Sequence, residues 1–236
     1  MKDIQIRDLR GMTEFQAAVQ LQRAVWGEDD MPDPADLMMV LQAEGGLVAG
    51  AFVEGRLVGF VFGFPTSDPA IQHSHRLAVL PEMRGLKLGS LLKWHQRDWC
   101  LARGIRHVRW TFDPMRPLNA SLNINHLGGR ASTYLVDYYG EMAGINSGLP
   151  SDRLMVDWHL DAPDVAARAR GDVPDGDGHC VLTVPVPMRG DEARPDAALA
   201  GRQRAVRESL LKAFADGCEI TGFDRAANAY RLSRKG

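Results

Sequence analysis

A short basic loop, Arg84-Gly85-Leu86-Lys87-Leu88-Gly89, is the stretch of this sequence best suited to hold an anion. It stands between a strand-like segment stopped by Leu80-Pro81 and a segment with helical spacing of apolar residues up to Ala102. The first N–H groups of a helix have no partner within the helix, and the helix dipole gives them partial positive charge. With Arg84 and Lys87 beside them, such amides can bind a phosphate. A plain strand-loop-helix connection is the alternative, because short glycine motifs often match by chance.

Two histidines precede this loop on a segment with strand periodicity. Both histidines belong to the odd-numbered residues of this segment, which are Ile71, His73, His75, Leu77 and Val79. The other set is Gln72, Ser74, Arg76 and Ala78. We therefore expect both imidazoles on one face. A neutral imidazole accepts a proton near neutral pH, so each histidine is a candidate general base. The simpler interpretation is that they only pack on or cap the strand.

The composition is typical of a globular protein: 45% of the 236 residues are hydrophobic and 25% are charged. The net charge of -2 provides no general attraction for nucleic acid or an anionic membrane, so neither is an expected partner. No apolar run approaches the roughly 20 residues of a membrane helix. The three cysteines, Cys100, Cys180 and Cys218, lack metal-ligand spacing. We expect a cytoplasmic protein without a metal.

Hydrophobic periodicity predicts the elements that position these groups. The expected strands are 4–7, 47–53, 56–64, 71–79, 107–112, 131–139 and 154–160, and the expected helices are 13–26, 34–43, 88–104 and 118–127. Thr13 and Gln16 have the spacing of a capping box. Asp33 followed by Pro34 reads as an N-cap with proline at the first helical position.

Residues 1–160 are expected to form the main domain. Residues 161–180, rich in Ala, Asp, Arg, Gly and Pro, read as a solvated linker. Residues 181–236 are expected to form a small C-terminal extension with a strand over 181–186, a helix over 195–215 and a hairpin over 219–232. Because this extension is too small to form an independent core, we expect it to pack on the main sheet or on that of a partner, which suggests a homodimer.

The run Leu77-Ala78-Val79-x-Pro81-Glu82-x-Arg84-Gly85-x-x-x-Gly89 resembles motif A of the GNAT acyltransferase superfamily. The family pattern is Arg/Gln-x-x-Gly-x-Gly/Ala, and Lys87 replaces its middle glycine. Trp110–Pro114, Asn119-Ala120 and Leu127-Gly128 resemble a bacterial subgroup of predicted acetyltransferases with a C-terminal extension. The resemblance implies the GNAT fold, of the α/β (α+β) class: a mixed central sheet flanked by helices.

The resemblance also implies a co-substrate, acetyl-CoA or another acyl-CoA. In the family its pantetheine arm bonds to main-chain groups where the motif strand parts from the next strand. Carried over, the cofactor-binding residues are Leu77, Ala78 and Val79 for the arm, and Arg84, Gly85, Leu86, Lys87, Leu88, Gly89 and Ser90 for the pyrophosphate. Asn119 occupies a position that often touches the cofactor, but it reads equally well as a helix N-cap.

Catalysis in the family is direct attack of an amine on the thioester, which needs a base for the amine and an acid for the thiolate. His73 stands where several relatives have a glutamate and is the first candidate base; His75 is the second. Ile124 replaces the tyrosine that usually serves as acid. Tyr134 is the candidate replacement, with Tyr138, Tyr139 or water as alternatives.

The sequence therefore predicts an acyl-CoA-dependent N-acyltransferase, expected to be an N-acetyltransferase of a small-molecule or protein amine. Lys87 and Ile124, the two departures from the family pattern, motivate an alternative: a non-catalytic acyl-CoA-binding or sensing module. A nucleotide-binding protein is a third interpretation. It is disfavoured because no Lys-Ser/Thr ending follows Gly89.

Overall fold

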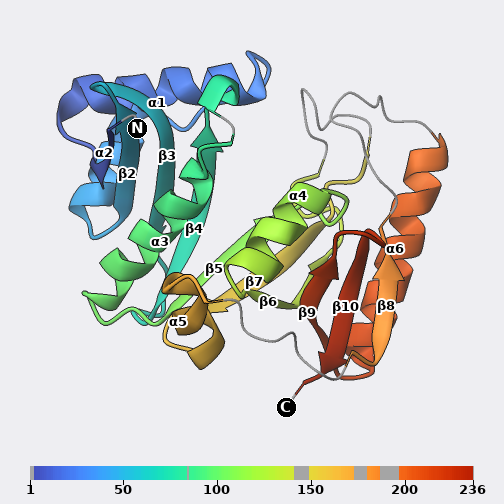
Figure 1. Cartoon of the computed structure of the whole chain (residues 1–236). Coiled ribbons are helices and arrows are strands. Elements are labelled where there is room, and N and C mark those ends of the chain that lie inside the picture. The colour runs from blue at the N-terminus through green and yellow to red at the C-terminus, as the bar shows by residue number, and fades with distance from the viewer. Residues whose placement is uncertain (1–2, 84, 141–148, 173–179, 187–196, 236) are drawn as a thin grey trace. The chain divides into compact units, whose positions relative to one another are not determined.

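The computed structural model describes residues 3–83, 85–140, 149–172, 180–186 and 197–235 (Figure 1). These residues form two compact units, 3–108 and 109–235, with the gaps just given. No helix in the described part of the chain is both long and apolar enough to cross a bilayer.

The first unit is a four-stranded antiparallel sheet with helices on both faces. Its elements are β1 (Ile4–Asp8), α1 (Gly11–Trp26), α2 (Ala35–Ala43), β2 (Leu47–Val53), β3 (Arg56–Pro65), β4 (Ile71–Val79), the 3₁₀ turn η1 (Pro81–Met83) and α3 (Leu88–Leu101). The strand order is β1-β2-β3-β4. Every residue of β2 is buried, as expected for a central strand covered on both faces. The tight hairpin between β2 and β3 turns at Glu54 and Gly55, both with positive φ, which confirms the predicted hairpin.

A β-bulge interrupts the pairing of β4 with β3. Phe62 pairs with Arg76, but the next residue of β3, Gly63, pairs with Ser74, so His75 is an extra residue in β4. A bulge places two residues of one strand opposite a single residue of its neighbour. The alternation of faces therefore shifts by one residue at this point.

Because of this shift, the even-numbered residues of β4 face α3 before the bulge, and the odd-numbered residues face it after the bulge. Ser74 bonds to Gln96 of α3 before the bulge. After the bulge Leu77 faces α3: a Cβ placed on Gly89 would have the Leu77 side chain as its nearest neighbour, at 3.8 Å. The prediction that both histidines lie on one face is confirmed, since their rings are 6.0 Å apart. The prediction that Leu77 and Val79 share that face was wrong, because a single inserted residue leaves no trace in the periodicity.

The two predicted helix caps were also wrong. Helix α1 begins at Gly11, two residues before the proposed capping box, and its N-cap Arg10 forms no side-chain cap bond. The N-cap of α2 is Pro34, again without a side-chain cap bond. The carboxylate of Asp33 is thus not used to start α2 and is available to the strand beside it.

The second unit holds a sheet in the order β5-β7-β6-β9-β10-β8, in which β6 pairs antiparallel with β7 and β9, and β10 pairs antiparallel with β9 and β8. Its elements are β5 (His107–Phe112, whose first two residues belong to the first unit), α4 (Pro117–Ala120), the π-helix η2 (Ser121–His126), β6 (Arg130–Leu135), β7 (Arg153–His159), α5 (Pro163–Ala169), β8 (Leu182–Pro185), α6 (Ala197–Ala215), β9 (Cys218–Asp224) and β10 (Ala229–Arg234). Strand β9 pairs with β6, so the last residues of the chain continue its sheet.

Three elements of this unit differ from expectation. The helix expected over 118–127 is divided into α4 and the π-turn η2, where the Asn125 side chain pairs with both main-chain groups of Phe223 on β9. Strand β6 ends at Leu135, before the predicted end at Tyr139. The expected linker contains α5, which buries Val165, so its small residues form a packed turn of helix and not only solvated chain.

Candidate functional site

The loop before α3 has the backbone of an anion site. Lys87, the N-cap of α3, adopts the left-handed conformation with φ 55°, and Gly85 has φ 89°. Left-handed backbone is uncommon for a residue with a Cβ, so Lys87 takes the conformation that a glycine at the same motif position would reach without strain. Arg84, a predicted pyrophosphate ligand, lies outside the described residues.

The first amides of α3 are available to a ligand. Within the part of the chain that the structure describes, the N–H groups of Leu88, Gly89 and Ser90 donate to no protein acceptor, and the first helical bond is from Leu91 N to Lys87 O. A Cβ on Gly89 would meet only Leu77, at 3.8 Å, so the space above this turn is open. Lys87 and Leu86 are exposed at the same edge. The residues present therefore fit a diphosphate.

The predicted pantetheine residues lie directly before this loop, at the end of β4. Leu77, Ala78 and Val79 pair along β3 with Val61, Phe60 and Gly59. The structure thus brings the main chain of β4 and the first turn of α3 together in one unit.

His75 lies beside the carboxylate of Asp33, a contact that no local sequence pattern indicates. Its Nε2 is 3.3 Å from Oδ1 of Asp33, which precedes α2. Arg76 lies against the same residue, with Nε 3.0 Å from Asp33 Oδ2, and its Nη1 is 2.7 Å from Asp30 Oδ1. The Arg76 guanidinium also stacks 4.7 Å from the centroid of the Trp26 ring. Neither carboxylate was predicted as a functional residue.

His73 belongs to a group of aromatic rings on the face of β4 that also carries His75. Its ring lies 5.2 Å from Phe64 at an interplanar angle of 34°, and 6.0 Å from His75. His75 in turn meets the edge of Phe62 at 5.7 Å. The two candidate bases are therefore neighbours, packed on one side by the phenylalanines of β3.

On the other face of β4, a buried polar cluster connects the strand with α3. The Nζ of Lys93 donates to Ser74 Oγ (3.0 Å) and Gln96 Oε1 (2.8 Å). Gln96 donates to Gln72 (2.7 Å), which also accepts from the Cys100 thiol. Desolvation lowers the pKa of Lys93 to about 7 and raises that of Cys100 to about 12. Sequence reasoning missed this cluster; its only signal was two polar residues, Lys93 and Gln96, at core-facing spacing on the helix.

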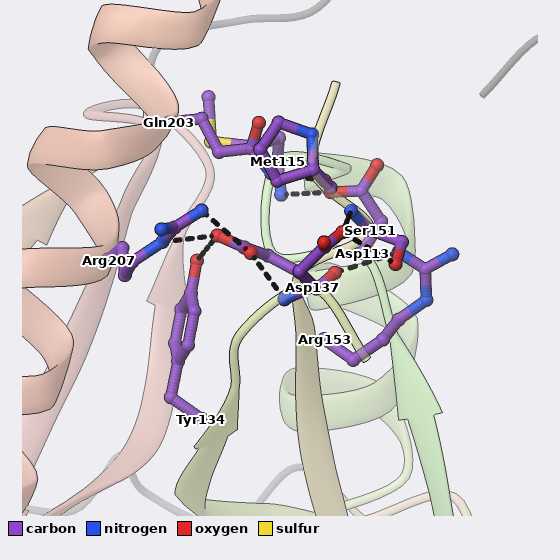
Figure 2. A network of polar contacts seen from close by, with 10 residues as sticks. Asp113, Met115, Tyr134, Asp137, Ser151, Arg153, Gln203 and Arg207 are labelled. Atoms are coloured by element: carbon purple, nitrogen blue, oxygen red, sulfur yellow. Dashed lines mark hydrogen bonds and ion pairs between the residues drawn. The ribbon is translucent and has the colours of Figure 1, made fainter. Parts of the chain in front are cut away.

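Tyr134 lies in the second unit, in a separate polar network that Figure 2 shows. Its hydroxyl donates to Oδ2 of the fully buried Asp152 at 2.7 Å. Arg207 of α6 bonds to both oxygens of that carboxylate, at 2.8 and 2.9 Å, and Asp137 N donates to Oδ1. Burial raises the pKa of Tyr134 well above its usual value, and the hydrogen bond to Asp152 and its charge raise it further.

The other acid candidates and Asn119 also lie in this unit. The Tyr139 hydroxyl bonds to Thr111 Oγ1 at 3.0 Å, and the rings of Tyr139 and Tyr138 meet edge to face. Asn119 is exposed within α4, whose N-cap is Arg116, so the reading of Asn119 as an N-cap was wrong. The structure does not group these residues with His73 and His75 in one unit.

Comparison with known proteins decides the family. Residues 12–121 match the model of the acetyltransferase (GNAT) family. The chain carries a GNAT acetyltransferase domain. The match covers α1, the motif strand β4, the loop and α3, so the expected family is confirmed. A comparison with curated proteins gives no match.

Solved structures with similar folds are acetyltransferases. The ribosomal-protein-S18-alanine N-acetyltransferase of Escherichia coli has a TM-score of 0.56 at 18% identity, covering 67% of this chain and 94% of that one. The yncA protein of Salmonella typhimurium, with its cofactor acetyl-CoA, has 0.56 at 17%, covering 67% and 95%. The phosphinothricin acetyltransferase of Sinorhizobium meliloti, in complex with acetyl-CoA, has 0.54 at 17%, covering 66% and 88%.

These likenesses confirm the predicted fold class. The GNAT domain has an α+β fold with a mostly antiparallel sheet flanked by helices, as in the solved acetyltransferases. At identities below 20% they say nothing about the acceptor. The GNAT domain is that of an acyltransferase.

Proposed function

We propose that this protein transfers the acetyl group of acetyl-CoA to an amine acceptor by direct attack of the amine on the thioester. The observation that carries the proposal is the first turn of α3: the N–H groups of Leu88, Gly89 and Ser90 donate to no acceptor in the described chain and lie beside Lys87. Support comes from two solved structures of similar fold that hold acetyl-CoA. In this proposal the turn binds the diphosphate of coenzyme A, since helix amides and a nearby cation favour phosphate.

The protein's contribution to the chemistry would be placement and proton transfer. The main chain of Leu77–Val79 would align the pantetheine arm, and a histidine of β4 would accept the proton that the amine loses. Acetyl-CoA supplies the activated acyl group. Tyr134 as the donor of a proton to the departing thiolate stays a prediction, and water is the alternative source.

Replacing Gly89 by Glu tests the binding site. Gly89 has ordinary helical backbone and open space above it, so a side chain fits without strain, but a carboxylate there would repel the diphosphate. We expect acetyl-CoA affinity, measured by calorimetry, to fall at least about tenfold, since each 1.4 kcal/mol of repulsion is a factor of ten. Gly201→Glu, at an exposed position of α6, adds the same charge elsewhere and should leave affinity unchanged.

Turnover then separates the enzyme from its alternative. Release of the coenzyme A thiol is followed with a fixed panel of amines: a polyamine, an aromatic monoamine, amino acids, and peptides with a free N-terminus or a lysine. Turnover with any of them supports the transferase. Tight acetyl-CoA binding without turnover on the whole panel would support the sensing module, and equal affinity of the Gly89 variant would remove the loop as the site.

The proposal also covers the acceptor, the cellular location and the oligomeric state. The acceptor is proposed to be a small-molecule or protein amine. Cytoplasmic location is proposed because Cys100, Cys180 and Cys218 all occur as thiols. The homodimer stays a prediction, for which sedimentation of the full chain at two concentrations is the test.

A further inference from the structure

The bulge in β4 turns two consecutive side chains toward one carboxylate. Consecutive residues of a regular strand point to opposite faces, so His75 and Arg76 could not both reach Asp33 without it. We propose that Asp33 positions His75 as the general base of the acyl transfer. This inference deepens the proposed function and rests on it.

Asp33 is held independently of the histidine. Its N–H donates to Gln22 Oε1 at 2.9 Å and its carbonyl accepts from Gln22 Nε2 at 3.3 Å. Gln22 is almost fully buried on α1. Arg76 neutralises the second carboxylate oxygen, and the α2 helix does not use the side chain as a cap. The carboxylate is therefore fixed by its own main chain and aimed at β4.

The contact determines which ring nitrogen of His75 can accept a proton. An ionised carboxylate only accepts hydrogen bonds, so Nε2 must carry the hydrogen that meets Asp33 Oδ1, and the lone pair lies on Nδ1. The His75 side chain is 32% exposed, whereas that of Asp33 is 15% exposed. A substrate can reach the ring, while its orienting partner stays covered. This is the arrangement of a base held by a third group.

The proton and electron balance of the step is simple. As the amine nitrogen bonds to the carbonyl carbon of the thioester, Nδ1 of His75 takes one proton from that nitrogen. The C–S bond breaks, its electron pair leaves with the coenzyme A sulfur, and water protonates the thiolate. His75 then returns its proton to solvent. The Asp33 carboxylate stabilises the imidazolium between these events.

The tautomer of His75 can be measured without any acceptor. In the ¹⁵N-labelled full chain, long-range ¹H–¹⁵N spectra identify which ring nitrogen carries the hydrogen, with His75→Gln for assignment. We expect the Nε2–H form in the parent protein and its loss or mixing in Asp33→Asn, whose amide can both donate and accept. Asp29→Asn, an exposed residue of the same segment, should leave the spectrum unchanged. An Nδ1–H form in the parent protein would overturn the inference.

Kinetics test the catalytic part, using the amine with the highest turnover in the panel. We expect His75→Gln to lower kcat about 100-fold. Asp33→Asn should lower it roughly 10- to 100-fold, the range for a charge-assisted hydrogen bond. The KM for acetyl-CoA should stay within about twofold, since Asp33 does not face the loop. In the double variant the Asp33 change should add almost nothing, because its effect passes through the imidazole.

The outcomes separate the two proposals. A further drop of the same size when Asp33→Asn is added to His75→Gln would overturn positioning, as would unchanged kcat in His75→Gln, which would transfer the base role to His73. If the tautomer is as expected but no amine is turned over, the proposed acetyl transfer fails and the placement of His75 by Asp33 survives.

Discussion

Two arginine–aspartate pairs in this protein have the same parts and different surroundings. In the first unit Asp33 shares its two oxygens between His75 and Arg76, and its side chain is 15% exposed. In the second unit Asp152 is completely buried, and Arg207 bonds to both of its oxygens while Tyr134 donates to one.

The two carboxylates differ in whether one of their partners could still exchange a proton with a substrate. Both oxygens of Asp152 accept hydrogen bonds from protein groups: Oδ2 from Tyr134 and Arg207, and Oδ1 from Arg207 and the Asp137 N–H. At Asp33 one partner is the His75 imidazole, whose side chain is 32% exposed and whose second ring nitrogen is the proposed proton acceptor. The same carboxylate–cation chemistry thus serves structure where it is closed and can serve proton transfer where it is open.

The largest expected contrast is in stability. Asp152→Ala leaves Arg207 without its carboxylate, and we expect a loss of about 3–5 kcal/mol in the free energy of unfolding, measured in urea. Asp33→Ala breaks a partly exposed pair, for which about 1 kcal/mol is expected. Losses of equal size would remove the distinction between a closed and an open pair.

The Lys93 cluster is a third case for this comparison. It is buried, like Asp152, but it lies against β4 in the first unit, like Asp33. Its folded pKa of about 7 is below the ordinary 10.5, so the unfolded chain binds more protons between these values and stability rises with pH. We expect a gain of about 2 kcal/mol from pH 7 to 9 that is absent in Lys93→Met. Lys212→Met, on the exposed side of α6, is the control and should keep the parent slope.

Tyr134→Phe gives the smallest effect and decides between two roles for the hydroxyl. Because its pKa is raised and its hydrogen is held by Asp152, we expect a stability loss of about 1.5 kcal/mol and kcat within twofold. Thermal unfolding and turnover are measured on the same preparation. A fall in kcat without a change in stability would instead support Tyr134 as the proton donor.

Local patterns predicted most of the first unit correctly. The hairpin 47–64, the strand over 71–79 and the helix after the basic loop are all present, since alternation, a two-residue turn and a glycine loop are signals within one stretch of chain. The loop residues from Gly85 to Ser90 likewise lie together because they are contiguous. The predicted cap at Asp33 failed because local spacing cannot tell a carboxylate used by its own helix from one used by a neighbouring strand.

The sequence by itself determined the order of elements, the basic glycine turn before α3 and the two histidines as candidate bases. Only the tertiary structure decided that His75 and Arg76 face the same carboxylate, that Lys93 is buried and that Tyr134 is held by Asp152. The physical reason is the same in each case. A bulge, a desolvated amine and a buried ion pair depend on groups that are distant in sequence, and these meet only when strands and helices have packed.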